Sequence, residues 1–321
     1  MKKFLHRLLI YFLFLGILIL SNFFIVELIY PKIDFSDIKN KFKNINADDS
    51  IKVFIGGDSR AERQIIPEIL NDKFGGVGVK NLACGACEIT RFKNFFQNTN
   101  FSTTNKILIL STSIFQVNES INYFDPWYSL SSFNSLNVFQ KYNSFSFKNY
   151  LIFSIESHKF LVKEKLKYFL KEYLKYSYSK VPYNENGFRP VKGFLDKKKE
   201  ININMNPLYS NIHMEGIRWL KFTESIYFFS NNFKKTYILI PPPSKYWKKI
   251  IIGTFIDKLN QNFIRKTKNY IKSNDLKNIV LIDFYNDPNI DLLDIHFYDM
   301  QHTNSEGAKV FTKYLSGEIC F

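Results

Sequence analysis

The sequence predicts an α/β fold: a flavodoxin-like three-layer sandwich in which helices cover both faces of a central parallel sheet. Five short apolar runs alternate along the chain with longer amphipathic stretches, a pattern typical of parallel strands joined by helical crossovers. Hydrophobic residues make up 45% of the chain, which is enough for a buried core. At 321 residues, the chain suits one large domain that carries an insertion.

The first predicted strand, 51–55, runs into a glycine turn. Apolar residues alternate through it, and the run stops at Gly56 and Gly57, as expected of a buried strand that ends in a tight turn. The next stretch, 61–70, has helical character. Ser59 therefore stands between the end of a strand and the start of a helix, where backbone N–H groups can stabilise an anion.

The later elements continue the alternation of short apolar runs and amphipathic stretches. In such sheets the ligand site lies at the carboxyl ends of the strands, so the residues that follow each strand are candidates for chemistry. The predicted elements are a strand at 78–82, a helix at 88–97, strands at 106–110 and 236–240, a helix at 248–271 and a strand at 278–283.

The interval 116–232 is too long for an ordinary crossover, and we expect it to form an insertion or cap over the site. It begins with an aromatic run, Tyr123–Tyr150, followed by an amphipathic helix near Ile155–Tyr176 and a turn-rich piece at 186–190. Its aromatic residues have a simpler explanation as internal packing.

The N-terminal segment predicts a membrane anchor. Residues 1–7 carry positive charges and 8–26 carry no charge, and an apolar helix over 8–29 would cross the roughly 30 Å of a bilayer's hydrocarbon core. Positive residues before this stretch and acids after it favour a cytoplasmic N-terminus. A cleaved signal peptide is the alternative, but no A-x-A site follows. We expect a single-pass protein of the cytoplasmic membrane, with a tether at 30–50 and a periplasmic or extracellular catalytic domain at 51–318.

The net charge of +15 could favour nucleic acid or an anionic membrane surface as a partner. The lysines are scattered, however, and the chain contains no arginine-rich strip and no RNA-binding signature. We therefore predict no nucleic-acid partner.

Two motifs at opposite ends of the domain predict catalysis. A serine is a poor nucleophile unless a base takes its proton. Residues 299–307 read DMQHTNSEG, so that Asp299 stands three residues before His302 and can orient its ring toward Ser59. In this triad Ser59 attacks an acyl carbon, His302 shuttles the proton, and Asp299 stabilises the imidazolium. His296 lacks this spacing and is expected to be structural. Each motif by itself has an ordinary alternative, a helix cap or a loop hydrogen bond.

The GDS sequence at 57–59 and the DxxHxNxxG pattern at 299–307 resemble blocks I and V of the SGNH (GDSL-type) hydrolase superfamily, and the resemblance covers roughly 50–318. It implies an acyl-enzyme mechanism without a metal or organic cofactor. It also implies oxyanion donors: the N–H of Ser59 and Gly85 after the second strand. The third donor is usually an asparagine in a GxND block. This chain has STSIFQVN at 111–118, so Ser113 or Asn118 would have to substitute.

This departure resembles the membrane-anchored acyl-transfer branch, such as the alginate acetyltransferases and the teichoic-acid D-alanylation protein. The resemblance implies an O-acyltransferase, with acetyl as the expected group, acting on a cell-envelope polysaccharide. The glycan and an acyl donor would be its substrates, and a multi-spanning membrane acyltransferase would be its partner. The alternatives are an esterase or deacetylase with the same triad, and a non-catalytic glycan-binding or scaffold protein.

Other residues near the motifs allow two interpretations each. Cys84 and Cys87 form a C-x-x-C with too few neighbouring ligands for zinc, and in an exported domain they are either a disulfide that shapes the Gly85 loop or two buried thiols. Arg60 could contact an anionic substrate or pair with an acid. The stiff PPPSKYW loop could present Tyr246 and Trp247 to a sugar or acyl chain, or be a structural turn.

Overall fold

The chain divides into two compact units, one made of Met1–Lys39 and Tyr123–Lys180 and the other of Asn40–Asn122 and Val181–Phe321. In the first unit, the described residues 6–7, 9–14 and 16–17 are helical. The second unit contains the sheet and both sequence motifs. The computed structural model describes residues 6–7, 9–14, 16–17, 41, 45, 50–85, 87–97, 102–119, 184, 186–197, 209 and 212–320.

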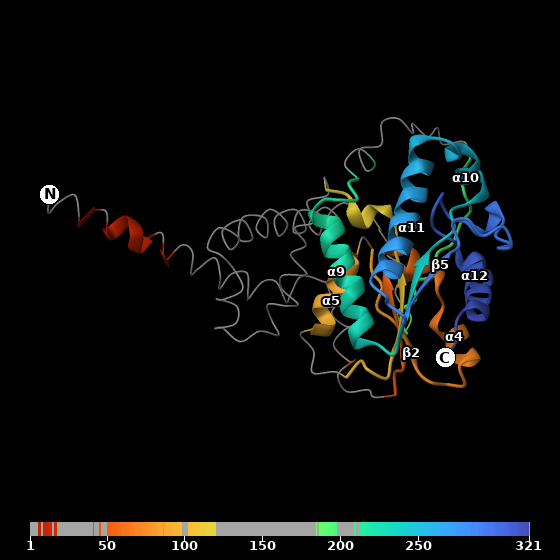
Figure 1. The fold of residues 1–321 in the computed structure, drawn as a ribbon, viewed down its shortest axis with the longest axis horizontal. Coiled ribbons are helices and arrows are strands. Elements are labelled where there is room, and N and C mark those ends of the chain that lie inside the picture. Colours follow the sequence, from red (N-terminus) through yellow and green to blue (C-terminus); the bar gives the residue numbers. More distant parts are fainter. Residues whose placement is uncertain are drawn as a thin grey trace, which may run out of the picture. The chain divides into compact units, whose positions relative to one another are not determined.

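A five-stranded sheet forms the centre of the second unit (Figure 1). All neighbouring strands are parallel, and their order is β2-β1-β3-β4-β5, which is the flavodoxin-like order. The predicted parallel sheet is thus confirmed. The strands are β1 (Val53–Gly57), β2 (Val79–Asn81), β3 (Ile107–Ser111), β4 (Lys235–Ile240) and β5 (Ile279–Asp283).

Helices connect the strands and close the unit. Consecutive strands are joined by helical crossovers, and the last helix follows the loop that carries the DxxH motif. Their bounds are α3 (Ser59–Gln64), α4 (Pro67–Lys73), α5 (Ile89–Gln97), the 3₁₀ turn η3 (Ile114–Val117), α9 (Ile217–Asn232), α10 (Lys245–Ile251), α11 (Phe255–Ser273), the 3₁₀ turn η6 (Asp294–His296) and α12 (Ser305–Glu318).

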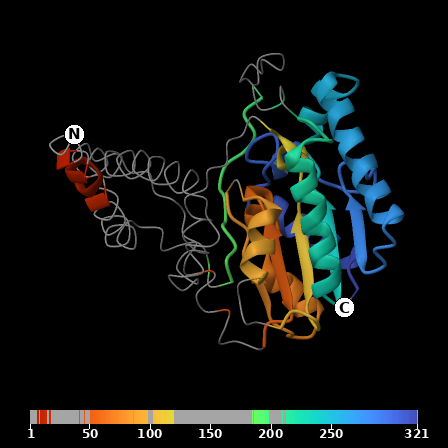
Figure 2. The ribbon, with the colours of Figure 1, turned by 60° about the vertical axis from the view of Figure 1, so that its left-hand side comes forward.

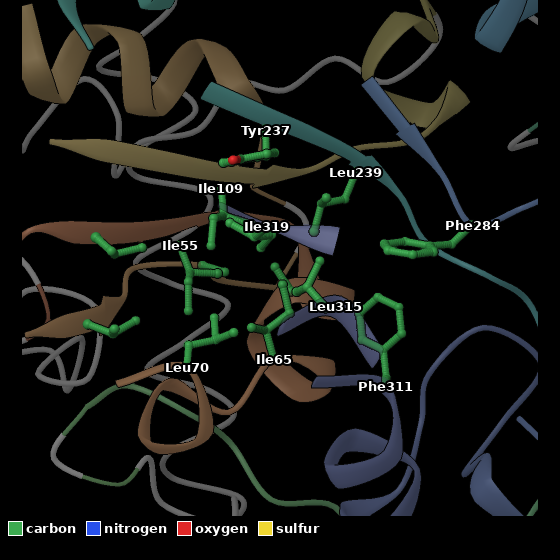
Figure 3. Close-up of a cluster of buried hydrophobic side chains, with 14 of the residues drawn as sticks. Ile55, Ile65, Leu70, Ile109, Tyr237, Leu239, Phe284, Phe311, Leu315 and Ile319 are labelled. Carbon is green, nitrogen blue, oxygen red and sulfur yellow. The ribbon is translucent and has the colours of Figure 1, made fainter. Parts of the chain in front are cut away.

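The sheet is buried on both faces, because alternate residues of each strand pack against different helices. On one face, Ile55 and Ile109 join a core with Leu70 of α4 and Leu315 of α12 (Figure 3). On the other face, the Phe54 ring lies 5.5 Å from that of Phe96 in α5. Figure 2 shows α5 and α9, in gold and teal, in front of the sheet. This arrangement is a three-layer sandwich.

The register of the sheet brings several loops together at one edge. Gly57 of β1 pairs with Ser111 of β3, Ser111 pairs with Leu239 of β4, and Leu239 pairs with Ile282 of β5. Since the strands are parallel and end in line, the segments that follow them meet at the same edge. Ser59 lies two residues beyond Gly57, and it is therefore placed at this edge.

Two predicted helices are each broken in two. The stretch 61–70 contains α3 and α4, which are separated because Pro67 disfavours a helical conformation at Ile66, and Ile66 is extended (φ −94°, ψ 109°). The stretch 248–271 contains parts of α10 and α11, with Gly253 between them in the left-handed region (φ 75°). The proline and the glycine are both visible in the sequence, and the prediction gave them too little weight.

The predicted cap at 116–232 includes one helix that belongs to the sandwich. Helix α9 contacts α5 and β4 and is the crossover between β3 and β4. The aromatic run Tyr123–Tyr150 and the predicted helix Ile155–Tyr176 lie outside the described residues. A cap over the site therefore stays a prediction.

Most of the predicted membrane anchor, 8–29, also lies outside the described residues. Among the residues that are described, no helix has the length and apolar character needed to cross a membrane.

Candidate active site

Ser59, His302 and Asp299 form a continuous hydrogen-bonded relay at the carboxyl edge of the sheet. The Ser59 Oγ lies 2.7 Å from His302 Nε2, and His302 Nδ1 lies 2.8 Å from Asp299 Oδ2. The distance between serine and histidine is that of a direct hydrogen bond. A carboxylate at Nδ1 favours the tautomer that carries its proton there, which leaves Nε2 free to accept the Ser59 proton.

The turn before Ser59 requires its glycine. Gly57 has φ 131°, and a side chain there would overlap the backbone oxygen of Ser111 on the neighbouring strand. Asp58 then caps α3, because its Oδ1 accepts a hydrogen bond of 3.0 Å from the Arg60 N–H. These two residues of the GDS motif therefore hold Ser59 as the first residue of α3.

The histidine loop is fixed by the remaining residues of the second motif. Asn304 caps α12 through the Gly307 N–H (3.0 Å), and its amide donates to the backbone oxygens of Gly193 and Ile295. A side chain at Gly307 would overlap the carbonyl of His296. His296 accepts a hydrogen bond from the Leu293 N–H and has the structural role expected of it. Asn304 and Gly307 thus position the loop that carries His302.

Two carboxylates near His302 are held in their ionised form. Burial by itself would raise the pKa of Asp299, but hydrogen bonds and charge from His302 and two backbone N–H groups bring that pKa below its ordinary value. Burial likewise opposes ionisation of Asp58, while Arg60 and, more weakly, His302 lower the Asp58 pKa. Both carboxylates are therefore negatively charged, and Asp299 accepts hydrogen bonds from the His302 backbone N–H and ring.

Arg60 pairs with an acid, one of the two interpretations that its position allowed. Its Nη2 lies 2.6 Å from Asp58 Oδ2 and its Nε lies 3.2 Å from Asp58 Oδ1. Both side chains are buried. The charge of Arg60 is therefore already balanced, although its side chain also lines the pocket beside the proline loop.

Gly85 lies in a loop that a disulfide closes beside the nucleophile. Cys84 and Cys87 are bonded to each other, which is one of the two alternatives left open by the sequence. The Cys84 N–H donates a hydrogen bond of 3.2 Å to the Gly57 oxygen, so the next residue, Gly85, is close to the Ser59 turn. Gly85 is exposed and has open space where a side chain would be. Its role as an oxyanion donor stays a prediction.

Of the two candidates for a third donor, Ser113 fits the site better than Asn118. Ser113 is 4% exposed, lines the pocket beside Arg60, and its Oγ has no hydrogen-bond partner among the described residues. Asn118 is fully buried and forms an antiparallel bridge with Ile212. Asn118 therefore belongs to the packing of the loop after η3.

A small pocket lies next to Arg60, and the prolines of the PPPSKYW loop, Pro241–Pro243, form part of its wall. Trp247 is buried and forms part of its wall, whereas Tyr246 lies outside the lining and donates its hydroxyl to the Lys197 oxygen. Sequence reasoning missed four lining residues. Gln301 stands inside the DxxH motif and Tyr285 follows β5, but Tyr209 and Asn260 carry no sequence signal. The lining is Arg60, Ser113–Phe115, Tyr209, Ile240–Pro243, Trp247, Asn260, Tyr285 and Gln301.

In the part of the chain that the structure describes, no three His, Cys, Asp or Glu side chains are placed together to hold a metal ion.

The chain matches no protein-family model and no curated protein at a significant level. Among solved structures, it is similar to a protein from Streptococcus pneumonia described provisionally as a platelet activating factor: 10% identity, a TM-score of 0.39, and coverage of 91% of this chain and 97% of that one. It is also similar to a catalytic mutant of an acetylxylan esterase from Geobacillus stearothermophilus: 9% identity, a TM-score of 0.39, and coverage of 86% and 97%. At these values the chemistry of this chain has to be argued from its own residues.

Proposed function

We propose that this chain is a serine-dependent acyl-transfer enzyme. The observation that carries the proposal is the relay of two short hydrogen bonds from Ser59 through His302 to Asp299. Serine, imidazole and carboxylate in this order form a nucleophile, a base and a group that orients the base. The motif resemblance to the SGNH superfamily supports the same chemistry.

The reaction proceeds through two half-reactions. Ser59 Oγ attacks the acyl carbon while its proton passes to His302 Nε2, and the oxyanion accepts hydrogen bonds from the N–H groups of Ser59 and Gly85 and from Ser113 Oγ. His302 returns the proton to the departing alcohol, which leaves an ester on Ser59. An acceptor hydroxyl then gives its proton to His302 and attacks this ester, and Ser59 is released with its proton restored.

The acceptor that we propose is a hydroxyl of a cell-envelope polysaccharide, with an acetyl group transferred. The chain would be anchored in the cytoplasmic membrane by 8–29, with the site outside, and would receive acyl groups from a multi-spanning membrane partner. The altered third block and the uncharged N-terminal stretch support this reading. The Cys84–Cys87 disulfide supports export, because disulfides persist in oxidising compartments.

One observation favours an esterase as the second candidate. The side chain of Asp299 is 44% exposed and that of His302 is 20% exposed, so water has access to the relay among the described residues. Water in place of a sugar hydroxyl would make the same intermediate hydrolyse. The relay itself counts against a purely non-catalytic scaffold.

The first test uses a fluorophosphonate, which reacts with an activated serine, on the purified full chain. Labelling of the wild type but not of Ser59→Ala or His302→Ala is expected, because either change removes the nucleophile or its base. The kcat for acyl transfer should fall roughly 10⁶-fold in these two variants. It should fall less, about 10⁴-fold, in Asp299→Ala, because the aspartate acts through the histidine.

A second measurement compares the fate of the acyl-enzyme with water and with a sugar acceptor. Faster turnover with the sugar would support transfer, and rapid hydrolysis unaffected by any sugar would favour the esterase. Equal labelling of the wild type and Ser59→Ala would overturn the proposal, as would unchanged glycan modification in cells that carry Ser59→Ala.

A further inference from the structure

Gln64 joins the helix that carries the nucleophile to the loop that carries the base. It is the last residue of α3, and Ser59 is the first. Its amide Nε2 donates a hydrogen bond of 2.9 Å to the backbone oxygen of Gln301, the residue directly before His302. One short helix therefore contacts the histidine loop at both of its ends, through the Ser59 hydroxyl at its start and through the Gln64 amide at its end.

The Gln64 amide acts on the peptide group that links Gln301 to His302. The oxygen of this group accepts from Gln64 Nε2, and its N–H donates to Asp299 Oδ1 at 2.9 Å. A peptide group is planar, so that partners at its two ends fix the orientation of the whole unit. The Cα of His302 lies in that plane. The hydrogen bond from Gln64 therefore places the start of the side chain whose Nε2 has to reach Ser59.

Neighbouring contacts of α3 do not hold this peptide group. Thr303 Oγ1 lies 3.5 Å from the Arg63 oxygen, which is beyond the usual range of a hydroxyl hydrogen bond. Thr312 Oγ1 donates to the Gln64 backbone oxygen at 3.0 Å, and this contact fixes the end of α3 to α12. The side-chain amide of Gln64 is thus the group that ties the peptide before His302 to the nucleophile helix.

Gln64 keeps its amide at a cost to the stability of the fold. The residue is 1% exposed, and its Oε1 has no hydrogen-bond partner among the described residues. Only the amide nitrogen can donate to a carbonyl, so the bond to Gln301 leaves this oxygen unpaired. A buried, unpaired acceptor lowers stability, and a methionine of similar length would fill the space without that cost. The amide therefore has a use that packing does not explain.

We infer that Gln64 is a positioning residue for the proposed reaction. Its amide holds the Gln301–His302 peptide so that His302 Nε2 stays within hydrogen-bond reach of the Ser59 hydroxyl. This inference rests on the proposed function and adds a residue to the machinery of that site. Gln64 acts through His302 and takes no part in bond making. The competing explanation is that Gln64 only stabilises the packing of α3 against the loop.

The variant Gln64→Met separates the two explanations, because it keeps the length of the side chain and removes the donor. We expect kcat for a small acyl ester to fall about 100-fold, the loss typical of a reacting group misplaced by roughly 1 Å. KM should stay unchanged, because the contacts to the substrate are untouched. The midpoint of denaturant unfolding should equal or exceed that of the wild type, because the unpaired acceptor is gone. Steady-state kinetics and unfolding of the full chain measure these quantities.

Asn278→Ala is the matched control, since it also removes an amide that donates to the backbone. Asn278 Nδ2 donates to the oxygens of Ser230 and Phe233 at 2.6 and 2.9 Å. It stands just before β5, at the end of the sheet opposite the site. Its loss should lower the unfolding midpoint and leave kcat unchanged. The same pattern in Gln64→Met would overturn the inference.

Labelling with a fluorophosphonate separates a misplaced base from a misfolded chain. The final extent of labelling counts folded sites, and its rate reports how well His302 activates Ser59. Gln64→Met should reach the extent of the wild type at a lower rate. If its extent is lower, Gln64→Leu repeats the measurement with a different apolar shape and should also label slowly. Failure of both variants to fold would show that Gln64 supports the fold itself, and would overturn the inference.

Crystal structures of the wild type and Gln64→Met make the outcome independent of activity. The distance from Ser59 Oγ to His302 Nε2 should increase in the variant beyond the roughly 3.2 Å of a hydrogen bond. A longer distance in the variant, together with a wild type that is not labelled, would reject the enzyme and keep the role of Gln64 in placing His302. Labelling that depends on Ser59, with the same distance and rate in Gln64→Met, would keep the enzyme and reject the positioning role.

Discussion

Asp58 is the residue of the GDS motif whose charge links the nucleophile turn to the histidine. It caps α3 and accepts two hydrogen bonds from the Arg60 side chain. Its pKa is also lowered by its electrostatic interaction with His302. Because its carboxylate is buried, it stabilises the fold only while these partners hold it in the ionised form. The local geometry of Ser59 thus depends on an ion pair that contains neither Ser59 nor His302.

The stability of the fold should depend on pH because of the Asp58–Arg60 ion pair. The pKa of Asp58 in the folded state lies below its ordinary value of 3.8, so its contribution is fully present above that value. The contribution is lost as the pH falls through the lower, folded-state pKa. We predict that Asp58→Asn is clearly less stable than the wild type at neutral pH, and that the difference shrinks below about pH 4. Denaturant unfolding at a series of pH values measures this difference in the free energy of unfolding between the wild type and Asp58→Asn. A difference that stays constant down to the lowest pH would contradict the prediction.

At the residue scale, the sequence predicted the residues that stand in short motifs. Ser59, Asp299 and His302 were found because their spacing along the chain determines which atoms can meet. Tyr209 and Asn260 were not predicted, because they line the pocket only through the packing of segments that are distant in the sequence. The pairing of Arg60 was left open, because a sequence does not specify which of two nearby partners a flexible side chain selects.

At the scale of elements, the loop between β2 and α5 has the clearest dependence on a covalent bond. The Cys84–Cys87 disulfide closes a turn of four residues, and Gln116 fastens its far end by donating to the Cys87 oxygen at 3.1 Å. A bond that closes so short a loop restrains the unfolded chain less than one that closes a long loop. Its larger effect should be on the position of the Gly85 N–H.

We predict that replacing both cysteines by alanine lowers the free energy of unfolding by about 2 kcal/mol, the value expected for a four-residue loop. Turnover of a small acyl ester should fall at least tenfold, because removing one oxyanion donor typically costs more than that. Denaturant unfolding and steady-state kinetics measure the two effects. Cys320→Ala is the matched control, since that cysteine is a free thiol near the end of the chain. Wild-type turnover in the double variant would show that the loop does not take part in the reaction.

The elements that the sequence predicted best are the strands, because a strand buried on both faces is a continuous apolar run. All five lie within two residues of their expected bounds. The helices were harder to predict, because amphipathic periodicity continues through a break such as Ile66 or Gly253. Helix α9 was placed in the insertion, because its sequence does not reveal that it packs on the sheet.

At the scale of the whole molecule, the strand order determines where the two motifs meet. Ser59 follows β1, an interior strand next to the edge strand β2, and His302 follows β5 at the other edge. The two residues are 243 positions apart in the chain, yet Ser59 Oγ lies 2.7 Å from His302 Nε2. In a parallel sheet all strands end at one edge, so residues from distant parts of the chain converge there. This convergence could be predicted from the alternation of elements, whereas the pocket beside Arg60 could not.

The orientation of the molecule in a membrane is the remaining prediction at this scale. Positive residues at 1–7 and acids soon after the apolar stretch should keep the N-terminus in the cytoplasm and place residues beyond about 30 outside. A reporter that is active only after export, fused after residue 45, should therefore be active, and a reporter that is active only in the cytoplasm should be silent there. Replacing the basic residues at 2, 3 and 7 by glutamine should weaken this bias, because the positive charges before the span set it. Activity of the cytoplasmic reporter in the wild type would overturn the orientation. It would also remove the envelope polysaccharide as the acceptor, since the site would then face the wrong side of the membrane.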